Sequence, residues 1–311
     1  MVKQLIECVP NFSEGRRKEV IEEIIGPFRS RKGCFLLDHR ADEDHNRLVV
    51  SVAGYPEDVC EALLEASRVA IEKIDLNVHR GGHPRIGAVD VIPFTPLKGI
   101  TMNECVKLSR DFGKRFWEEM KVPVYFYEES AARPERKKLE NIRRGQYEVL
   151  KEGISDPARH PDVGEPVLHP TAGATVTGAR KFLVAFNVNL KTDDMKTAKN
   201  IAARVRASGG GLSHVKAIAL PLTDRKMVQV SMNIVDYEKN SLYTVLEMLR
   251  SEARRWGTEV AETEIYGMIP AGALLESVAS YMQIAGFDPS QVLELKLLEV
   301  AGAEDNGKTL S

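Results

Sequence analysis

The chain has 311 residues, with 43 Lys and Arg against 45 Asp and Glu, so its formal net charge is −2. Because binding to a phosphate backbone requires an excess of positive charge, this balance argues against a nucleic-acid partner. No apolar run reaches the roughly 20 residues that a membrane-spanning helix needs, and charge interrupts the N-terminus too early for a signal peptide. We therefore expect a soluble, cytoplasmic protein with no nucleic-acid or membrane partner. The length predicts two domains.

Strand-like and helix-like patterns alternate along the first half of the chain. Apolar runs predict strands at 5–9, 34–38, 47–52, 88–94 and 123–127. Amphipathic spacing predicts helices from about residue 17, from Pro56, over 102–120 and, in a highly charged segment, over 133–151. From 153 to 177 the chain is rich in Pro, Gly and His and has neither period, so we expect a linker or a binding loop.

The second half resumes the same alternation. Predicted strands cover 182–188, 215–220, 227–235 and 259–266, and predicted helices cover 192–207 and 241–256 and begin near 270 and 289. Both halves contain the order strand, polar turn, long helix. The predicted fold class is therefore α/β (α+β), with two similar subdomains that are each a mixed β-sheet with helices packed on it. We place them at 1–180 and 181–300, followed by a tail at 301–311.

The cysteines all fall in the first third of the chain, and no two of them form a CxxC pair. They are Cys8, Cys34, Cys60 and Cys105. Each has apolar neighbours typical of a strand or a helix. We interpret them as buried thiols rather than as disulfides or metal ligands.

The segment 79–90 holds the densest set of reactive side chains. His79 and His83 have the i, i+4 spacing of a metal-binding pair, but that spacing works only on a helix, and Gly81 and Gly82 oppose one. The segment lacks the glutamate of that motif, so a metal site is disfavoured. Two interpretations remain open from the residues alone. Either His83 acts in general acid–base catalysis, or both histidines are turn residues that bond backbone carbonyls.

Two further polar clusters lie elsewhere in the chain. Asp38 ends one predicted strand, where it either orients a histidine or caps a turn, and Arg47 begins the next. Arg47 either binds a substrate carboxylate with two hydrogen bonds or pairs with a neighbouring acid. In 164–181, small and hydroxylated residues stand beside Arg180 and Lys181, which suits a flat polar ligand with carboxylates. No glycine pattern of a nucleotide-binding loop is present.

Three long motifs carry a resemblance to a known family. They are CVPNFSEG at 8–15, HPRIGAVDV with PF at 83–94, and GATVTGARKFL with AFN at 173–187. They resemble the formiminotransferase domain of formimidoyltransferase-cyclodeaminase, in the order of that family and from residue 4 to about residue 300. The bifunctional relatives carry a further all-helical cyclodeaminase domain, so we expect this chain to be a stand-alone transferase.

The resemblance implies transfer of a formimidoyl group between N-formimidoyl-L-glutamate and tetrahydrofolate, giving 5-formimidoyltetrahydrofolate and L-glutamate, in histidine degradation. It implies a homodimer, a folate tunnel between the two subdomains, tetrahydrofolate as co-substrate and no metal. It also makes His83 the catalytic histidine. The resemblance assigns folate contacts to Gly164, Glu165, Pro166, Val167, Leu168, His169, Pro170, Thr171, Ala172 and Gly173.

The chemistry of this transfer suggests further substrate-binding residues. An attacking amine must lose a proton and a departing amine must gain one, and a single histidine can do both. The cationic amidinium of the donor calls for a carboxylate, for which Asp38 and Asp90 are candidates. The carboxylates of glutamate call for cations. The full set of candidates is Asp38, Asn46, Arg47, Arg85, Asp90, Arg180 and Lys181.

Other functions remain open from the sequence. Transfer of a formyl group from N-formylglutamate would differ from formimidoyl transfer only by O in place of NH. A non-catalytic folate-binding module would keep the motifs for reasons of folding. A metal-dependent hydrolase is the least favoured of the alternatives.

Overall fold

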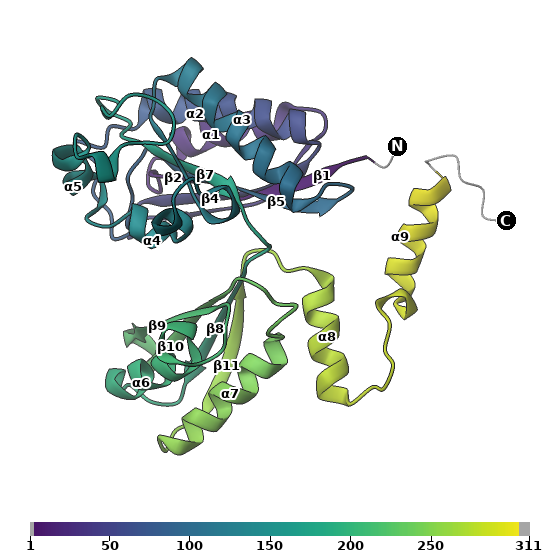
Figure 1. The fold of residues 1–311 in the computed structure, drawn as a ribbon. Helices are drawn as coiled ribbons and strands as arrows, with labels where there is room; N and C mark the ends of the chain where they lie inside the picture. Colours follow the sequence, from purple (N-terminus) through teal and green to yellow (C-terminus); the bar gives the residue numbers. More distant parts are fainter. Residues whose placement is uncertain (1–2, 305–311) are drawn as a thin grey trace. The chain divides into compact units, whose positions relative to one another are not determined.

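The computed structural model describes residues 3–304, and side chains up to residue 300. Contacts divide the chain into two compact units, 1–181 and 182–311 (Figure 1). Both units combine a sheet with helices, which confirms the predicted α/β class. Among the described residues, no helix is long and apolar enough to span a membrane.

The first unit is built on a seven-stranded sheet. Its strands are β1 Leu5–Cys8, β2 Asn11–Phe12, β3 Cys34–Asp42, β4 Arg47–Gly54, β5 Val89–Lys98, β6 Val124–Phe126 and β7 Thr175–Ala179. The strand order is β1-β4-β2-β5-β7-β6, with β3 paired to β4. β7 runs parallel to both β5 and β6, and the other pairings are antiparallel, so this sheet is mixed, as predicted.

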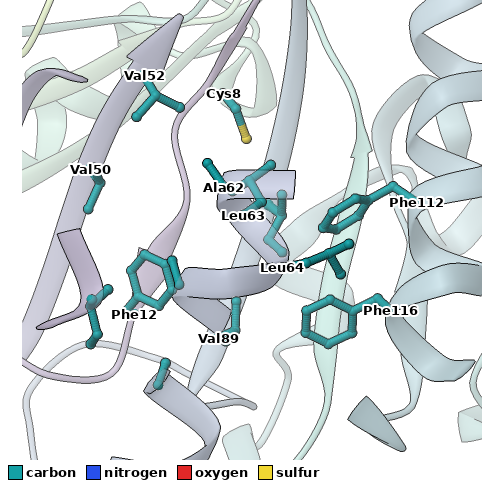
Figure 2. Close-up of a cluster of buried hydrophobic side chains, with 14 of the residues drawn as sticks. Cys8, Phe12, Val50, Val52, Ala62, Leu63, Leu64, Val89, Phe112 and Phe116 are labelled. Atoms are coloured by element: carbon teal, nitrogen blue, oxygen red, sulfur yellow. The ribbon is translucent and has the colours of Figure 1, made fainter. Parts of the chain in front are cut away.

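Three long helices supply the apolar side chains that pack on this sheet. They are α1 Lys18–Ser30, α2 Pro56–Lys73 and α3 Met102–Met120. Phe12 and Val89 from the strands lie in one buried cluster with Leu63 of α2 and Phe116 of α3 (Figure 2). Burying large apolar side chains of this kind contributes about 1.5–3 kcal/mol each to the free energy of unfolding. The four cysteines are all buried and free, as predicted.

The predicted helix over 133–151 is wrong, because the chain there breaks into short pieces. These are η2 Pro134–Lys137, α4 Leu139–Ile142 and α5 Gln146–Gly153. Gly145 has a φ of +80°, a left-handed conformation that a continuous helix cannot contain. The break leaves Arg143 between α4 and α5, where it reaches the candidate site described below. Two further short 3₁₀ turns are η1 Glu128–Ser130 and η3 Pro157–Arg159.

The second unit has a four-stranded sheet that is antiparallel throughout, which corrects the prediction of a mixed sheet. Its strands are β8 Val184–Leu190, β9 Val215–Leu222, β10 Met227–Ile234 and β11 Val260–Tyr266, in the order β11-β8-β10-β9. The short turn η5 Thr223–Arg225 joins β9 to β10 as a hairpin, and a hairpin connection requires antiparallel neighbours.

Helices complete the second unit. They are α6 Met195–Val205, α7 Leu242–Arg255, α8 Ala271–Met282 and α9 Leu293–Glu304, with the 3₁₀ turns η4 Ala207–Gly209 and η6 Pro289–Gln291. Alternate residues of β8, among them Val184 and Val188, are buried in one cluster with Ile201 of α6 and Leu249 of α7. Of the predicted tail at 301–311, the first four residues continue α9, and 305–311 lie outside the described residues.

Candidate active site

The loop between α2 and β5 forms a pocket with the turn between β3 and β4. Its lining residues are Asn11, Phe12, Ser13, His45, Asn46, Arg47, His79, His83, Arg85 and Asp90. The pocket thus brings together five of the predicted site residues from distant parts of the chain. These five are Asn46, Arg47, His83, Arg85 and Asp90.

The three sequence motifs meet at this loop. Ser13, in the first motif, donates from Oγ to the carbonyl of Gly87 over 2.7 Å, and its N–H donates to the carbonyl of Ala88 over 2.9 Å. The N–H of Ala174, in the third motif, donates to the carbonyl of Ile86 over 3.0 Å. The second motif is therefore fixed on both sides by the other two, which positions the side chain of His83.

His83 is held as a neutral imidazole by its partners. Nη1 of Arg47 lies 2.8 Å from Nε2 of His83. Because a guanidinium can only donate, Nε2 must be the acceptor and the proton of the ring must sit on Nδ1. The ring also has a hydrogen bond with the backbone of Pro84, for which Nδ1 is the remaining nitrogen.

Burial, followed by the positive charges of Arg47 and Arg143 and the nearby ring of His45, lowers the pKa of His83 to about 3, against the hydrogen bond with Pro84. The rings of His45 and His83 meet edge to face with their centroids 6.4 Å apart. At neutral pH the side chain of His83 is thus uncharged and carries a lone pair directed at Arg47.

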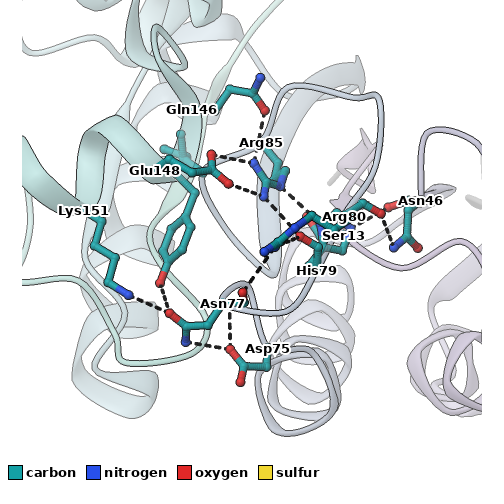
Figure 3. A network of polar contacts seen from close by, with 12 residues as sticks. Ser13, Asn46, Asp75, Asn77, His79, Arg80, Arg85, Gln146, Glu148 and Lys151 are labelled. Atoms are coloured by element: carbon teal, nitrogen blue, oxygen red, sulfur yellow. Dashed lines mark hydrogen bonds and ion pairs between the residues drawn. The ribbon is translucent and has the colours of Figure 1, made fainter.

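His79 is held in place by hydrogen bonds at both nitrogens of its ring. Its Nε2 lies 3.0 Å from the carbonyl of Asn46, to which it donates, and its Nδ1 accepts from Nε of Arg85 over 3.2 Å (Figure 3). Burial lowers the pKa of His79, which keeps the ring neutral. Both ring nitrogens are occupied, so His79 fixes the shape of the loop.

Arg85 is fully engaged with neighbouring side chains. Its guanidinium donates to both carboxylate oxygens of Glu148, over 2.7 and 2.9 Å, and to Oε1 of Gln146 over 3.1 Å (Figure 3). The side chain of Arg85 is only 6% exposed. These contacts tie the start of α5 to the loop that carries His83.

Asp90 is also engaged inside the protein. Its Oδ1 accepts from the N–H of Ile86 over 2.8 Å, and its Oδ2 forms an ion pair with Arg143. The residue is 2% exposed. Arg143 was missed by the sequence analysis, because a continuous helix over 133–151 would have given it no particular direction. The glycine at position 145 was the one local signal of the break.

Asn46 holds two loops together. Its Oδ1 accepts from the N–H of Gly15 over 2.9 Å, and its Nδ2 donates to the carbonyl of Arg80 over 3.0 Å. A Cβ at Gly15 would stand 2.2 Å from the carbonyl oxygen of Asp42. This close approach explains why the first motif ends in glycine.

Three of the predicted residues lie outside this pocket. Asp38 accepts from Nε of Arg40 over 2.9 Å on β3. Arg180, just after β7, donates from its backbone to the carbonyl of Phe94 and from Nη1 to the carbonyl of Lys181, both over 2.9 Å. The structure does not bring Asp38, Arg180 or Lys181 to the lining around His83.

The predicted folate segment, 164–173, has two distinct parts. Gly164, Glu165, Pro166 and Val167 are exposed, and the side chain of Leu168 packs against the core. His169, Pro170 and Thr171 form a turn that ends at Ala172 and Gly173, both buried. The carbonyl of Ala172 accepts from the N–H of Ala88, and Gly173 forms a bridge with Gly87. The turn therefore lies against the loop that carries His83.

Among the residues that the structure describes, no group of three or more His, Cys, Asp or Glu side chains is arranged to hold a metal ion. The site is thus a pocket of an α/β protein that contains a neutral histidine in contact with Arg47, and its lining residues Arg85 and Asp90 are paired with Glu148 and Arg143.

Comparison with known proteins gives the family of this chain. Residues 5–180 match the N-terminal subdomain of the formiminotransferase domain, and residues 185–295 match the formiminotransferase domain. A protein of Streptococcus pyogenes serotype M1, named glutamate formimidoyltransferase, is 45% identical over 95% of this chain and 99% of its own length. A protein of the same name from Thermoplasma acidophilum is 44% identical over 96% of this chain and 99% of its own length.

A longer relative has the same region. The formimidoyltransferase-cyclodeaminase of Mus musculus is 44% identical over 90% of this chain, which corresponds to 53% of that protein. The chain belongs to the formiminotransferase family, and the resemblance inferred from its motifs is confirmed.

Proposed function

We propose that this protein transfers the formimidoyl group between N-formimidoyl-L-glutamate and tetrahydrofolate, with His83 as the proton carrier. Relatives named for this activity match nearly the full length of the chain. The observation that carries the role of His83 is the meeting of the three motifs at one loop. That arrangement fixes the imidazole, which is only partly buried, at the lining of the pocket.

The reaction needs one proton to be moved twice. N5 of the folate attacks the formimidoyl carbon, and the new C–N bond gives a tetrahedral intermediate. His83 takes the proton that N5 loses and gives it to the α-nitrogen of glutamate as the old C–N bond breaks. The products are 5-formimidoyltetrahydrofolate and glutamate, and His83 returns to its neutral form. Such proton transfer contributes about 10²–10⁴ in rate, and alignment of the two bound substrates supplies much of the rest.

The contacts of the charged residues separate their proposed roles. Arg85 forms an ion pair with Glu148, and Asp90 forms one with Arg143. Because both charges are already paired inside the protein, we assign Arg85 and Asp90 to positioning the loop that carries His83. Arg47 touches His83 and lines the pocket, which makes it our candidate for binding a carboxylate of the donor. A guanidinium suits this task because it can hold both carboxylate oxygens at once.

We assign folate contacts to the segment 164–173. Its buried end, Ala172 and Gly173, lies against Gly87 and Ala88, four and five residues after His83. A folate held by the exposed part of this segment would thus be bound by the same stretch of chain that supports the loop of His83.

The test is a turnover assay with purified protein, tetrahydrofolate and each of two donors. We expect 5-formimidoyltetrahydrofolate to form from N-formimidoyl-L-glutamate, and a much lower kcat/KM with N-formyl-L-glutamate. Equal or better turnover of the formyl donor would contradict the assignment of the transferred group. Folate binding without turnover of either donor would contradict an enzymatic function.

A further inference from the structure

The first unit contains a second cavity, lined by side chains from β6, η2, α4, α5 and η3. Its volume is about 340 Å³. Sites for small organic molecules have volumes of about 300–1,000 Å³, so a ligand of that kind fits. The residues that line this cavity do not overlap with those around His83 or with the predicted folate segment, 164–173. The cavity is therefore a separate candidate site.

One part of its lining is apolar and fixed in place. Tyr125 of β6 and Leu150 of α5 are both buried in the cluster against which Ile142 of α4 packs. The hydroxyl of Tyr125 donates to the carbonyl of Arg159 over 2.6 Å, which holds the ring at one angle. A flat aromatic ligand gains free energy on such a surface by burying its faces against a ring and two aliphatic side chains.

The rest of the lining carries more positive than negative charge. Three of its residues are arginines, Arg136, Arg144 and Arg159. Glu135 is the acid of the lining, and its side chain is exposed. Arg136 is 4% exposed and pairs with the buried Asp162 over 2.6 Å, so its charge is already balanced inside the protein.

Arg144 and Arg159 differ from Arg136, because neither forms an ion pair within the described residues 3–304. The guanidinium of Arg144 donates to the neutral Oδ1 of Asn141, over 3.4 Å. The side chain of Arg159 lies along the end of α5, where a Cβ at Gly153 would stand 3.1 Å from its Cδ. Two guanidinium groups beside an apolar surface suit a ligand that joins a ring to carboxylates, since each can hold both oxygens of a carboxylate.

We propose that this cavity binds an aromatic carboxylate, with its ring against Tyr125 and its carboxylates at Arg144 and Arg159. The proposed function supplies such a ligand, because tetrahydrofolate carries a p-aminobenzoylglutamate group with one aromatic ring and two carboxylates. To that extent the inference rests on the proposed function. A free aromatic carboxylate has the same chemistry and is the other source that the experiment must distinguish.

The position of Arg143 connects the cavity to the pocket of His83. Arg143 stands between Ile142 and Arg144, which line the cavity, and pairs with Asp90, which lines the pocket. Both sites thus adjoin the same ion pair. The tail of a folate whose pterin ring lies at His83 is therefore the occupant that we assign to the cavity.

The first measurement is isothermal titration calorimetry with p-aminobenzoyl-L-glutamate, which has the ring and both carboxylates but no group that reacts. We expect saturable binding to the native protein and none of p-aminobenzamide, which has the ring without a carboxylate. In Arg144→Met and Arg159→Met the Kd should rise about 10-fold or more, because each variant loses a charge-assisted hydrogen bond. Lys137→Met is the matched control, since Lys137 is an exposed cation of η2 that does not line the cavity.

Tetrahydrofolate identifies the source of the ligand. Displacement of p-aminobenzoyl-L-glutamate by tetrahydrofolate would assign the cavity to the folate tail. In turnover, Arg144→Met and Arg159→Met should then raise KM for tetrahydrofolate about 10-fold, with kcat within about two-fold of native. With 6-methyltetrahydropterin, which has no tail, both variants should match the native protein in kcat/KM. Binding that tetrahydrofolate does not displace would assign the cavity to a free aromatic carboxylate and overturn the folate tail as its occupant.

Two results would overturn the proposal as a whole. One is the absence of saturable binding of p-aminobenzoyl-L-glutamate to the native protein. The other is the same Kd in Arg144→Met and Arg159→Met as in Lys137→Met. Absence of turnover in the native protein is a different result, because the calorimetry requires no reaction, and it would contradict the proposed function itself.

Discussion

Gly81 lies against the backbone of His45, so closely that a Cβ at position 81 would stand 2.2 Å from the carbonyl oxygen of His45. This contact joins the loop that carries His83 to the β3–β4 turn, which precedes Arg47. The neighbouring Gly82 has no such contact, since a Cβ there would be 3.7 Å from the nearest atom, the carbonyl oxygen of Asp44.

The pair of glycines gives a matched prediction about loop placement. Gly81→Ala must push the loop away from His45, because the neighbouring atoms are backbone and cannot turn aside. We expect it to cost about 1–3 kcal/mol of stability and to lower kcat about 10- to 100-fold. Gly82→Ala should be close to the native protein in both stability and kcat. Urea unfolding and turnover measure the two effects, and equal behaviour of the two variants would contradict the loop contact.

The ion pair between Asp90 and Arg143 is predicted to be structural. Asp90→Ala leaves Arg143 without its buried partner, so we expect a loss of about 3–5 kcal/mol in the free energy of unfolding. Removing the second charge as well, in Asp90→Ala with Arg143→Ala, should recover part of that loss. Urea unfolding of the three proteins measures this. A single Asp90→Ala variant that loses less than about 1 kcal/mol would contradict the burial of the pair.

Glu7 on β1 predicts a dependence of stability on pH. Burial raises the pKa of its carboxyl to about 7, against the charge of Arg180. Below pH 4.5 the carboxyl is protonated in both the folded and the unfolded state. Above about pH 7 it is charged in both, and the folded state bears the cost of burying the charge. Stability from this group is thus lost as the pH rises from 4.5 to 7.

Glu7→Gln remains neutral throughout this range. Relative to the native protein, we expect it to gain on the order of 1–3 kcal/mol between pH 5 and pH 8. Urea unfolding at the two pH values gives the difference. If Glu7→Gln and the native protein differ in free energy of unfolding by the same amount at both pH values, Glu7 does not titrate in this window.

His79 and His83 are predicted to fail in different ways when replaced. His79→Ala removes the partner of the Asn46 carbonyl and of Arg85, so we expect a loss of about 1–3 kcal/mol in stability, with activity falling as the loop loosens. His83 is only partly buried, and its replacement removes the acceptor of one Arg47 hydrogen bond, so we expect a smaller loss of stability. Thermal unfolding separates the two histidines, and an equal loss of stability in His83→Ala would contradict this division.

Local patterns predicted most of the fold. The helix at 102–120 was predicted at its observed bounds from its amphipathic spacing, and the structure shows that Thr101 and Glu104 cap its start. The prediction of one helix over 133–151 was wrong, although the charge pattern of this segment suits a helix. Gly145 has a left-handed φ, and Arg143 forms an ion pair with Asp90, which lies outside the segment. The second sheet was misjudged because strand direction depends on how distant strands pair, and a single-strand pattern does not contain that.

The candidate site was predictable only in part, because local patterns do not contain contacts between residues that are distant in the sequence. Gly81 and Gly82 argued against a helix in the segment 79–90, and the family resemblance singled out His83 as the predicted catalytic residue. The contact of Arg47 with His83 joins residues 36 positions apart, so no local pattern contained it. The choice of Arg85 and Asp90 as substrate ligands relied on charge alone, whereas their partners, Glu148 and Arg143, lie in the segment that was mistaken for one helix.

The central claim is that His83 carries the proton in formimidoyl transfer. Steady-state turnover of His83→Ala with N-formimidoyl-L-glutamate and tetrahydrofolate tests it most directly. We expect kcat to fall by about 10²–10⁴, the contribution of general acid–base catalysis, with KM for both substrates within a few-fold of the native values. A kcat close to that of the native protein would contradict the claim.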